Sequence, residues 1–391
     1  MEIHSLSTTH FRNLASTAVE FHPGLNLIVG DNGQGKTTLL EALALLAGRP
    51  SFRTSDLSEV ISEKQVSAFA SGRIVPHGGA AEGRAATPRT LGLQLEGGRR
   101  RHALDGRPAG RLEVRRLLPS VFLTREDLGR LTGTPAGRRA AIDRVALVLD
   151  PLHARNLRRY DAVRAAKTRL LSEAKSPAAA ALESFEEVLV DAGALVAVSR
   201  RLAVTALAGH LGRHAIRLGS TFPAPTPRLL SDLPAEPDHD ALRAALRAAI
   251  GTARAEELRR GRCLVGPQLD DVELVSGEVP LATRASSGES RSLVLAWTLA
   301  EADVLRESAG APPLIAFDDF DSEWDPGALE RFAGAVDDDA QIFLTSARPE
   351  AVQDLPLPAG SLIRVHEGRL QREGILGGGR APRENRRKAS R

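Results

Sequence analysis

The hydrophobic pattern of the first part of the chain predicts strands and helices in alternation. Leu25 to Val29 is apolar apart from Asn26 and predicts a buried strand, and Thr37 to Ala47 predicts a helix that ends at Gly48. Residues 91–96 and 99–104 flank a Gly-Gly pair and predict a β-hairpin. These signals favour an α/β fold.

The pattern becomes helical between about Asp127 and Leu218, where Ala, Leu, Arg and Glu dominate. Pro177 is expected to separate two long helices that form an antiparallel hairpin. One face of the second helix is marked by steps of three and four residues, at Leu182, Phe185, Leu189, Ala192, Val196 and Ser199. Either a lever-like arm or an ordinary helical subdomain fits this pattern.

Changes in composition divide the chain into four expected segments. Five prolines between residues 219 and 240 mark a connector, and residues 76–90, rich in Gly, Ala and Pro, predict a mobile loop. After a short helix near 240–260, strand and helix signals resume. The expected segments are a head in two parts (1–126 and 219–372), a helical arm (127–218) and a basic, flexible tail (373–391).

Composition narrows the class of protein. The 391 residues are 42% hydrophobic, enough for a sizeable core, and no apolar run approaches the roughly 18 residues of a membrane helix. The N-terminus lacks the pattern of a signal peptide. A single cysteine, Cys263, excludes a disulfide framework and a cysteine-rich zinc site, and we interpret it as a small buried residue. We therefore expect a cytoplasmic protein.

A phosphate-binding motif lies between the predicted strand and the predicted helix. Its pattern, G-x-x-x-x-G-K-[ST], needs glycines so that backbone N–H groups and the helix N-terminus can converge on phosphate oxygens. Lys36 is expected to contact the β- and γ-phosphates of ATP, and the Thr37 hydroxyl to bind Mg²⁺. The candidate contacts are Gly30, Asp31, Asn32, Gly33, Gln34, Gly35, Lys36, Thr37 and the adjacent Thr38.

A second apolar run, Pro313 to Phe317, leads into Asp318 and Asp319. A buried strand that ends in two carboxylates is expected to place them at the ligand-binding edge of a parallel sheet. Asp318 then suits Mg²⁺, directly or through water, and Asp319 suits orienting or deprotonating the attacking water. The alternative is an acidic loop, which the phosphate motif makes less favourable.

A serine-glycine element precedes this strand by about 30 residues. Ser286-Ser-Gly-Glu289 leads into a predicted helix with Leu293, Trp297, Ala300 and Val304 on one face. Alone it is a common helix cap. Its place between the phosphate motif and the acidic strand resembles the signature of ABC-type ATPases, in which one subunit's signature binds the γ-phosphate held by the other. The implied nucleotide contacts are Ser286, Gly288 and Glu289.

The order of these motifs resembles the SMC-like ABC-type ATPases, and the length of the insertion narrows the match to the RecF family of bacterial recombination and repair. The helical insertion of about 90 residues allows limbs of at most roughly 60 Å, far shorter than an SMC coiled coil. The resemblance extends from residue 1 to about 372. It rests on Phe11-Arg12-Asn13, Gly48 to Thr54, Val121-Phe122 with Glu126 to Leu128, Arg138-Arg139, Gly266-Pro267 with Asp270-Asp271, and Ser322 to Asp325.

The sequence departs from the family pattern at several places. Gln268-Leu269 replaces a His-Arg pair, Trp324 replaces leucine, and Ala165-Ala166-Lys167 replaces Gln-Arg-Asn. No Q-loop glutamine is evident. These departures indicate a divergent member, or a paralogue with altered partners.

The resemblance implies an α/β fold, with an SMC-like P-loop ATPase head and an inserted α-helical arm. It implies a slow ATPase, because each site is complete only in an ATP-dependent homodimer. That dimer would bind duplex or gapped DNA and, with RecO and RecR, support RecA loading. It also implies that Arg12 and Asn13 lie near the nucleotide phosphates, and that Thr345-Ser346 takes the switch position where many ABC ATPases have histidine.

The distribution of charge suggests where DNA contacts lie. Residues 127–215 carry 12 Arg and 2 Lys against 9 acidic residues. Residues 1–379 as a whole have a net charge of −2. Arg155, Arg158 and Arg159 share a helical face and suit phosphate contacts, although a solvated face fits them equally well. Arg53 and Arg73 are weaker candidates. The tail, Arg380 to Arg391, has six basic residues and one Glu, and is expected to bind DNA or nothing specific.

Two other functions remain open at this stage. A nucleotide-sensing scaffold would bind ATP and DNA without needing hydrolysis, and a P-loop phosphotransferase is disfavoured because no acceptor pocket is evident. With only 14 aromatic residues, stacking on single-stranded bases is poorly supported, so duplex backbone binding is preferred.

Overall fold

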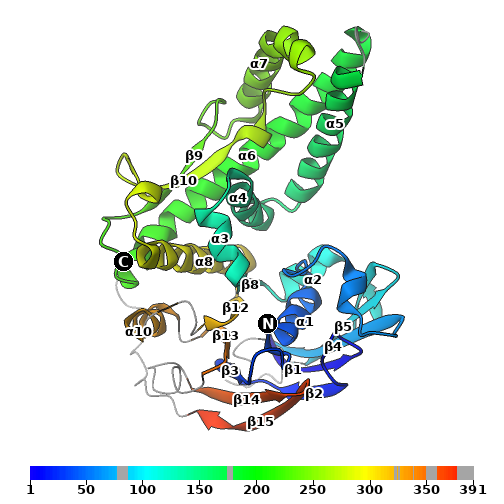
Figure 1. Cartoon of the computed structure of the whole chain (residues 1–391), viewed down its shortest axis with the longest axis vertical. Helices are drawn as coiled ribbons and strands as arrows, with labels where there is room; N and C mark the ends of the chain where they lie inside the picture. The colour runs from blue at the N-terminus through cyan, green and yellow to red at the C-terminus, as the bar shows by residue number, and fades with distance from the viewer. Residues whose placement is uncertain are drawn as a thin grey trace. The chain divides into compact units, whose positions relative to one another are not determined.

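A computed structural model describes residues 1–76, 87–173, 179–320, 324, 326–337, 339–348 and 359–376 (Figure 1). The chain forms two compact units. The first unit comprises Met1–Leu128, His214–Ser220 and Arg291–Arg391, and the helical unit comprises Gly129–Arg213 and Thr221–Ser290. Residues 221–290 were expected in the head, but they group with the helical unit because α7 packs on α5, and β10 packs on α4.

The first unit contains a six-stranded sheet with mainly parallel strands. Its order is β15-β14-β3-β13-β12-β8, and only β15 runs antiparallel to its neighbour. The two strands predicted from apolar runs, β3 and β12, are confirmed and wholly buried, as strands covered on both faces must be. The strands are β3 (Leu25–Val29), β8 (Ser120–Leu123), β12 (Leu314–Phe317), β13 (Gln341–Ser346), β14 (Gly360–His366) and β15 (Arg369–Leu376).

A second, antiparallel sheet of the first unit has the order β2-β1-β4-β5-β6-β7. The predicted hairpin is confirmed as β5 and β6, whose turn residues Gly97 and Gly98 have φ of 55° and 69°, as a two-residue hairpin turn requires. The strands are β1 (Glu2–Thr9), β2 (Thr17–Glu20), β4 (Ser67–Val75), β5 (Arg89–Glu96), β6 (Arg99–Leu104) and β7 (Arg107–Ala109). Most of the loop predicted at 76–90 lies outside the described residues.

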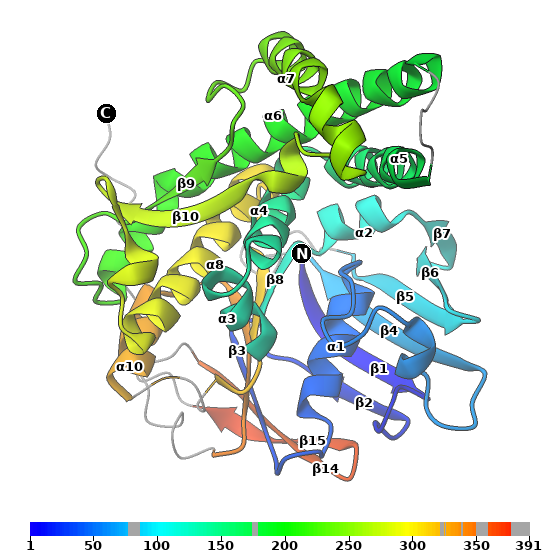
Figure 2. The same ribbon diagram turned by 45° about the horizontal axis from the view of Figure 1, so that its top comes forward.

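Helix α1 (Lys36–Leu46) packs on β4 and β5 of the antiparallel sheet and on β13 of the parallel sheet (Figure 2). Ten of its eleven residues are buried, because both sheets contribute to the same core. The predicted apolar face of α8 (Ser287–Ala309) is confirmed, since Leu293, Trp297, Ala300 and Val304 are all buried. The remaining helices of this part are η1 (Leu57–Val60), α2 (Arg111–Leu117), α3 (Arg125–Thr132) and α10 (Pro326–Ala335).

The helical unit contains the two long helices that the sequence predicts, α5 and α6, which lie side by side (Figures 1 and 2). Pro177 itself lies outside the described residues. Five of the six predicted seam positions of α6 are buried, and Phe185 is half-buried. The helices are α4 (Pro135–Leu149), α5 (His153–Glu173), α6 (Ala179–Arg217, whose last residues belong to the first unit) and α7 (His239–Arg260).

The connector predicted from five prolines contains a strand. β9 (Thr226–Leu230) pairs with β10 (Asp271–Ser276), which pairs in turn with β11 (Val279–Pro280). Pro227 is tolerated because β9 is the edge strand, where a missing N–H breaks no inner ladder. Short helices η2 (Pro267–Leu269) and η3 (Leu281–Thr283) flank β10 and β11. In the described part of the chain, no helix is long and apolar enough to cross a membrane.

Candidate nucleotide-binding site

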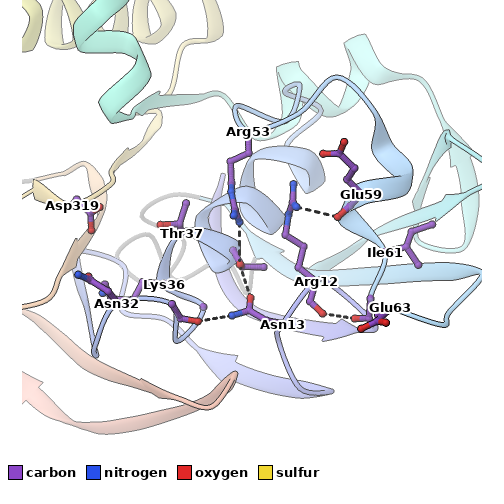
Figure 3. Close-up of a pocket in the computed structure, with 14 residues that line it drawn as sticks. Arg12, Asn13, Asn32, Lys36, Thr37, Arg53, Glu59, Ile61, Glu63 and Asp319 are labelled. Carbon is purple, nitrogen blue, oxygen red and sulfur yellow. Dashed lines mark hydrogen bonds between the residues drawn. The ribbon is translucent and has the colours of Figure 1, made fainter.

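The phosphate motif forms the loop between β3 and the N-terminus of α1 and lines a cleft of about 770 Å³ (Figure 3). Gly30 has φ of 153°, and a Cβ there would lie 2.3 Å from the Val365 carbonyl oxygen. Gly35 has φ of 119°, and a Cβ there would lie 2.9 Å from the side chain of Leu14. Only glycine fits these two positions, so the loop can place its backbone N–H groups around an anion.

Lys36 is buried at 4% exposure and has only carbonyl oxygens as hydrogen-bond acceptors among the described residues. Its Nζ donates to the carbonyl oxygens of Gly30 (2.7 Å) and Asp31 (3.1 Å), and no carboxylate of the described chain pairs with it. A buried cation that forms no salt bridge favours binding of an anion. Asn32 and Gly33 line the same cleft.

The two carboxylates follow β12, at the same sheet edge as the phosphate loop. Asp318 Oδ1 accepts hydrogen bonds from Thr37 Oγ1 (3.1 Å) and Thr345 Oγ1 (2.8 Å). Burial raises the pKa of Asp318, the charge of Asp319 raises it further, and the two hydroxyls oppose this shift. Asp319 lines the cleft and has φ of 49°, in the left-handed region. The phosphate motif and the acidic strand end thus lie together, and the Thr37 hydroxyl contacts the Asp318 carboxylate directly.

Thr345, at the carboxyl end of β13, links the carboxylate of Asp318 to the backbone of Asp319. Its Oγ1 donates to Asp318 Oδ1 and accepts from the backbone N–H of Asp319, each at 2.8 Å. β13 lies between β3 and β12, so Thr345 is aligned with the ends of both strands that carry the site. Sequence reasoning placed Thr345 at the switch position but missed this double contact, because it depends on strand order.

The donor set of Thr37 and Asp318 suits Mg²⁺, which takes hydroxyl and carboxylate oxygens and retains water and phosphate ligands. Asp318 Oδ1 and Thr37 Oγ1 already lie in hydrogen-bond contact at the cleft, so one cation can replace the shared proton. No group of three or more His, Cys, Asp or Glu gathers around a possible metal position in the described part of the chain.

Asn13 and Arg12 connect the loop to its surroundings. Asn13 Nδ2 donates to the Gly33 carbonyl oxygen (2.7 Å), and its Oδ1 accepts from Thr38 Oγ1 (2.8 Å), so it bridges the loop and the first turn of α1. Arg12 pairs with the buried carboxylate of Glu41 through Nε (2.6 Å) and Nη2 (2.9 Å). Both residues line the cleft, as the family resemblance implied they would lie near the phosphates.

Glu41 was missed by sequence reasoning. It is fully buried in α1 and also accepts from Ser51 Oγ (2.6 Å), while Arg53 lies 3.6 Å away. Arg53, a weak candidate for DNA contact, lines the nucleotide cleft instead. The available signal was a lone carboxylate inside the apolar run of α1, since a buried Glu is rare unless it is paired.

The signature residues lie at the start of α8, in the helical unit, whereas the phosphate loop belongs to the first unit. The Ser286 N–H donates to Glu289 Oε2 (2.9 Å) and the Glu289 N–H donates to Ser286 Oγ (3.2 Å), which is a reciprocal capping box. Thr221 Oγ1 also donates to Glu289 Oε1 (2.5 Å), and these donors lower the pKa of Glu289. Glu289 therefore shapes the signature loop, and Gly288 keeps it free of side-chain bulk.

The arm candidates for DNA contact are exposed on α5. Arg155, Arg158 and Arg159 form no ion pair with any described residue, in contrast to the buried arginines of the same unit. Of the departures from the family pattern, Gln268 accepts a hydrogen bond from Tyr160, and Lys167 is buried against Glu186 and Glu257. Trp324 packs on Phe320, at a ring-centroid distance of 5.3 Å. The basic tail lies outside the described residues.

The comparisons with known proteins agree with this geometry. The family model described as "RecF/RecN/SMC N terminal domain" matches residues 2–369. A "DNA replication and repair protein RecF" from Myxococcus xanthus is 31% identical over 376 residues, covering 95% of this chain and 97% of the relative. The protein of that name from Frankia alni is 33% identical over 363 residues, covering 89% and 93%. A solved structure of "the recombination mediator protein RecF-ATPrS in RecFOR pathway" shares the fold, with a TM-score of 0.82, 21% identity and coverage of 95% and 98%.

Proposed function

The chain belongs to the RecF family of DNA replication and repair proteins, and we propose that it is an ATPase whose ATP-bound homodimer holds DNA during repair. The observation that carries this proposal is the contact of Thr37 with Asp318, beside the buried Lys36, whose hydrogen bonds go to carbonyl oxygens. The solved relatives include RecF proteins with ATP and with an ATP analogue. Proteins with the relatives' name act in DNA replication and repair.

The chain's own residues account for nucleotide binding. The phosphate chain of ATP is held by the N–H groups of the loop, and Lys36 exchanges its two carbonyl acceptors for phosphate oxygens. Thr37 and Asp318 hold Mg²⁺, which would neutralise charge on the β- and γ-phosphates. Asn13, held by Gly33 and Thr38, fixes the shape of the loop during this exchange.

Hydrolysis needs a group that acts on water. Asp319 lines the cleft directly after Asp318, and its backbone N–H is fixed by Thr345. We assign it the role of orienting the attacking water and accepting its proton. Ser286, Gly288 and Glu289 form the surface that completes the site of the partner subunit. The turnover is accordingly slow and depends on dimerisation and DNA.

DNA binding is assigned to the exposed arginines of α5, whose guanidinium groups suit phosphate contacts. Duplex or gapped DNA is the proposed ligand, RecO and RecR are the proposed partners, and support of RecA loading is the proposed outcome. The relatives' names and the solved RecF structure from the RecFOR pathway support this part of the proposal.

Sizing the protein with and without ATP and gapped duplex tests the proposal. We expect monomers without nucleotide and dimers with ATP, and a hydrolysis rate per subunit that rises with protein concentration and with DNA. A protein that stays monomeric in saturating ATP would contradict the proposal. A nucleotide-sensing scaffold would also dimerise, so Asp319→Asn distinguishes the two. If this variant binds ATP and still supports repair in cells, hydrolysis is dispensable.

A further inference from the structure

Positive charge is concentrated in one part of the first unit, which we call the arginine-rich lobe: β5, β6, β7 and α2, residues 89–117. Its net charge is +5, as large as that of the whole helical insertion and packed into about a third of the length. The near-neutral charge of residues 1–379 conceals this local excess. The lobe has eight arginines, Arg89, Arg99, Arg100, Arg101, Arg107, Arg111, Arg115 and Arg116, and three carboxylates, Glu96, Asp105 and Glu113.

The carboxylates of the lobe do not balance its cations. Asp105 pairs with Arg89 at 2.8 Å, and Glu113 accepts from the Gly110 N–H at the start of α2. Burial, reinforced by neighbouring arginines, lowers the pKa of Arg100 to about 10 and that of Arg115 to about 9. These guanidinium groups remain charged at neutral pH, and their mutual repulsion favours an added anion.

A groove of about 670 Å³ runs across β4, β5, β6 and β7 on the sheet face that points away from α1. Its floor is made of small or compact residues that lie opposite one another across the strands, namely Ser71, Gly92, Ala103 and Pro108. The next row contains Phe69, Gln94 and Arg101, also paired across the strands. Phe69 is 42% exposed, although aromatic side chains are rare in this chain.

The groove combines three properties that together point to one ligand class. Arg101 and Arg111 line it and suit phosphates, Phe69 offers an exposed ring, and Gln94 offers amide hydrogen-bonding groups. Arg101 also pairs with Glu96 at 3.4 Å, but both side chains are at least half exposed, so the pair is easily exchanged. A flat aromatic ring beside guanidinium groups on an open antiparallel sheet suits unpaired bases, whose faces are free to stack.

We propose that this groove binds single-stranded nucleic acid, with one base stacked on Phe69 and the adjoining phosphates held by Arg101 and its neighbours. This proposal extends the proposed DNA-binding function, because gapped DNA presents an unpaired strand beside a duplex. A duplex keeps its bases stacked inside, so it would gain from the arginines but not from the ring. The groove lies within one unit of one chain and therefore requires neither ATP nor the dimer.

The test measures fluorescence anisotropy of a labelled oligo-dT and of a labelled duplex of equal length, without ATP. Phe69→Ala is expected to weaken binding of the single strand about 5- to 10-fold and to leave the duplex unchanged, because only unpaired bases stack. Arg101→Gln is expected to lower the salt slope for the single strand by about 0.7, the value for one lost phosphate contact. Thermal melting checks that each variant is folded.

Arg116→Gln is the matched control, because Arg116 is exposed in the same lobe but does not line the groove. It should leave the single-strand slope unchanged. The proposal is overturned if the wild-type protein does not bind oligo-dT, if Phe69→Ala has no effect or weakens both ligands equally, or if Arg116→Gln matches Arg101→Gln. ATP-dependent dimerisation and duplex binding are scored separately, so the groove can fail while the proposed ATPase function stands.

Discussion

Of the three lysines that the structure describes, two are buried, and they differ in what surrounds them. Lys167, in the helical unit, lies 2.6 Å from a Glu257 oxygen and 3.0 Å from a Glu186 oxygen, so its charge is compensated by carboxylates. Lys36, in the first unit, meets only two carbonyl oxygens. The comparison shows that burial alone does not mark a functional cation. The useful sign is a buried cation that is held by carbonyl oxygens instead of a salt bridge.

The same contrast extends to the buried arginines. Arg200 in the helical unit pairs with Asp143 (2.8 Å) and Asp270 (2.9 Å) and donates to the Pro267 carbonyl oxygen. This network uses four of the five guanidinium N–H groups of Arg200, and it holds α4, α6 and η2 together. In the cleft of the first unit, Lys36 instead donates to carbonyl oxygens that phosphate oxygens can replace. We therefore expect substitutions in the two regions to separate stability from activity.

Lys36→Ala should give the largest functional effect. It removes two charge-assisted contacts to phosphate and should weaken ATP binding at least about 100-fold, because each such hydrogen bond contributes roughly 1.5–3 kcal/mol. The melting temperature should change little, because Lys36 forms no salt bridge whose loss would leave a carboxylate unpaired. Fluorescent-nucleotide titration measures the affinity. Lys64→Asn is the control, since Lys64 is exposed and its φ of 65° tolerates Asn. A large loss of stability in Lys36→Ala would break the comparison.

Lys167→Met should give the converse result. It leaves the buried carboxylates of Glu186 and Glu257 without their shared cation and should lower the free energy of unfolding by about 3–5 kcal/mol. ATP affinity should be retained in the folded fraction. Urea unfolding and nucleotide titration measure the two quantities. Adding Glu257→Gln should restore part of the stability. No recovery in the double variant would mean that packing, rather than unpaired charge, dominates.

Thr345→Val should separate binding from catalysis within the first unit. The methyl group cannot donate to Asp318 or accept from the Asp319 N–H, so the Asp318 carboxylate and the Asp319 backbone lose their common support. We expect kcat to fall about 10-fold with a smaller change in KM, and Thr345→Ser to restore it. Ser346→Ala is the control, because that hydroxyl only accepts from the Arg348 N–H among the described contacts. Equal losses in both variants would assign Thr345 a merely structural role.

Asp318→Asn should give the smallest effect, on the nucleotide-free protein. The folded state raises the pKa of Asp318 above its ordinary 3.8, so the folded state binds this proton more tightly than the unfolded state does. Wild-type stability therefore falls as pH rises from 3.8 through the raised pKa, and the variant escapes this loss. We expect a melting temperature about 2 °C above wild type at pH 7.5 and no gain at pH 3.5. A variant that is less stable than wild type at both pH values would contradict the raised pKa of Asp318.

Local patterns predicted much of the fold and the core of the site. β3, α1, the β5–β6 hairpin, β12 and the buried face of α8 follow from hydrophobic runs, glycines and helix periodicity. The phosphate loop and the acidic pair are contiguous in sequence, so their residues could be named before their geometry was known. The contact between Thr37 and Asp318 follows once parallel strands are assumed, since their carboxyl ends meet at one edge.

Features that depend on contacts between distant segments were not predictable. The pairing of Arg12 with Glu41 and the double contact of Thr345 need strand order and helix placement. β9 was hidden by its prolines, which an edge strand tolerates. The grouping of residues 221–290 with the helical unit depends on where β10 and α7 pack. The arginine-rich lobe was concealed because charge was summed over long segments instead of over neighbouring strands.

Helix α1 separates the two sites of the first unit at which anionic ligands, ATP and a nucleic acid strand, are proposed to bind. Its N-terminus faces the phosphate cleft, while the carbonyl oxygens at its far end, of Leu45, Gly48 and Arg49, are contacted by His102, Arg115 and Arg100. Eleven residues span about 16 Å, so the charges at the two ends interact weakly because of distance, although burial of the helix limits screening by salt. ATP and a nucleic acid strand would use different side chains and would not compete. A displacement of the helix would carry a signal from one end to the other.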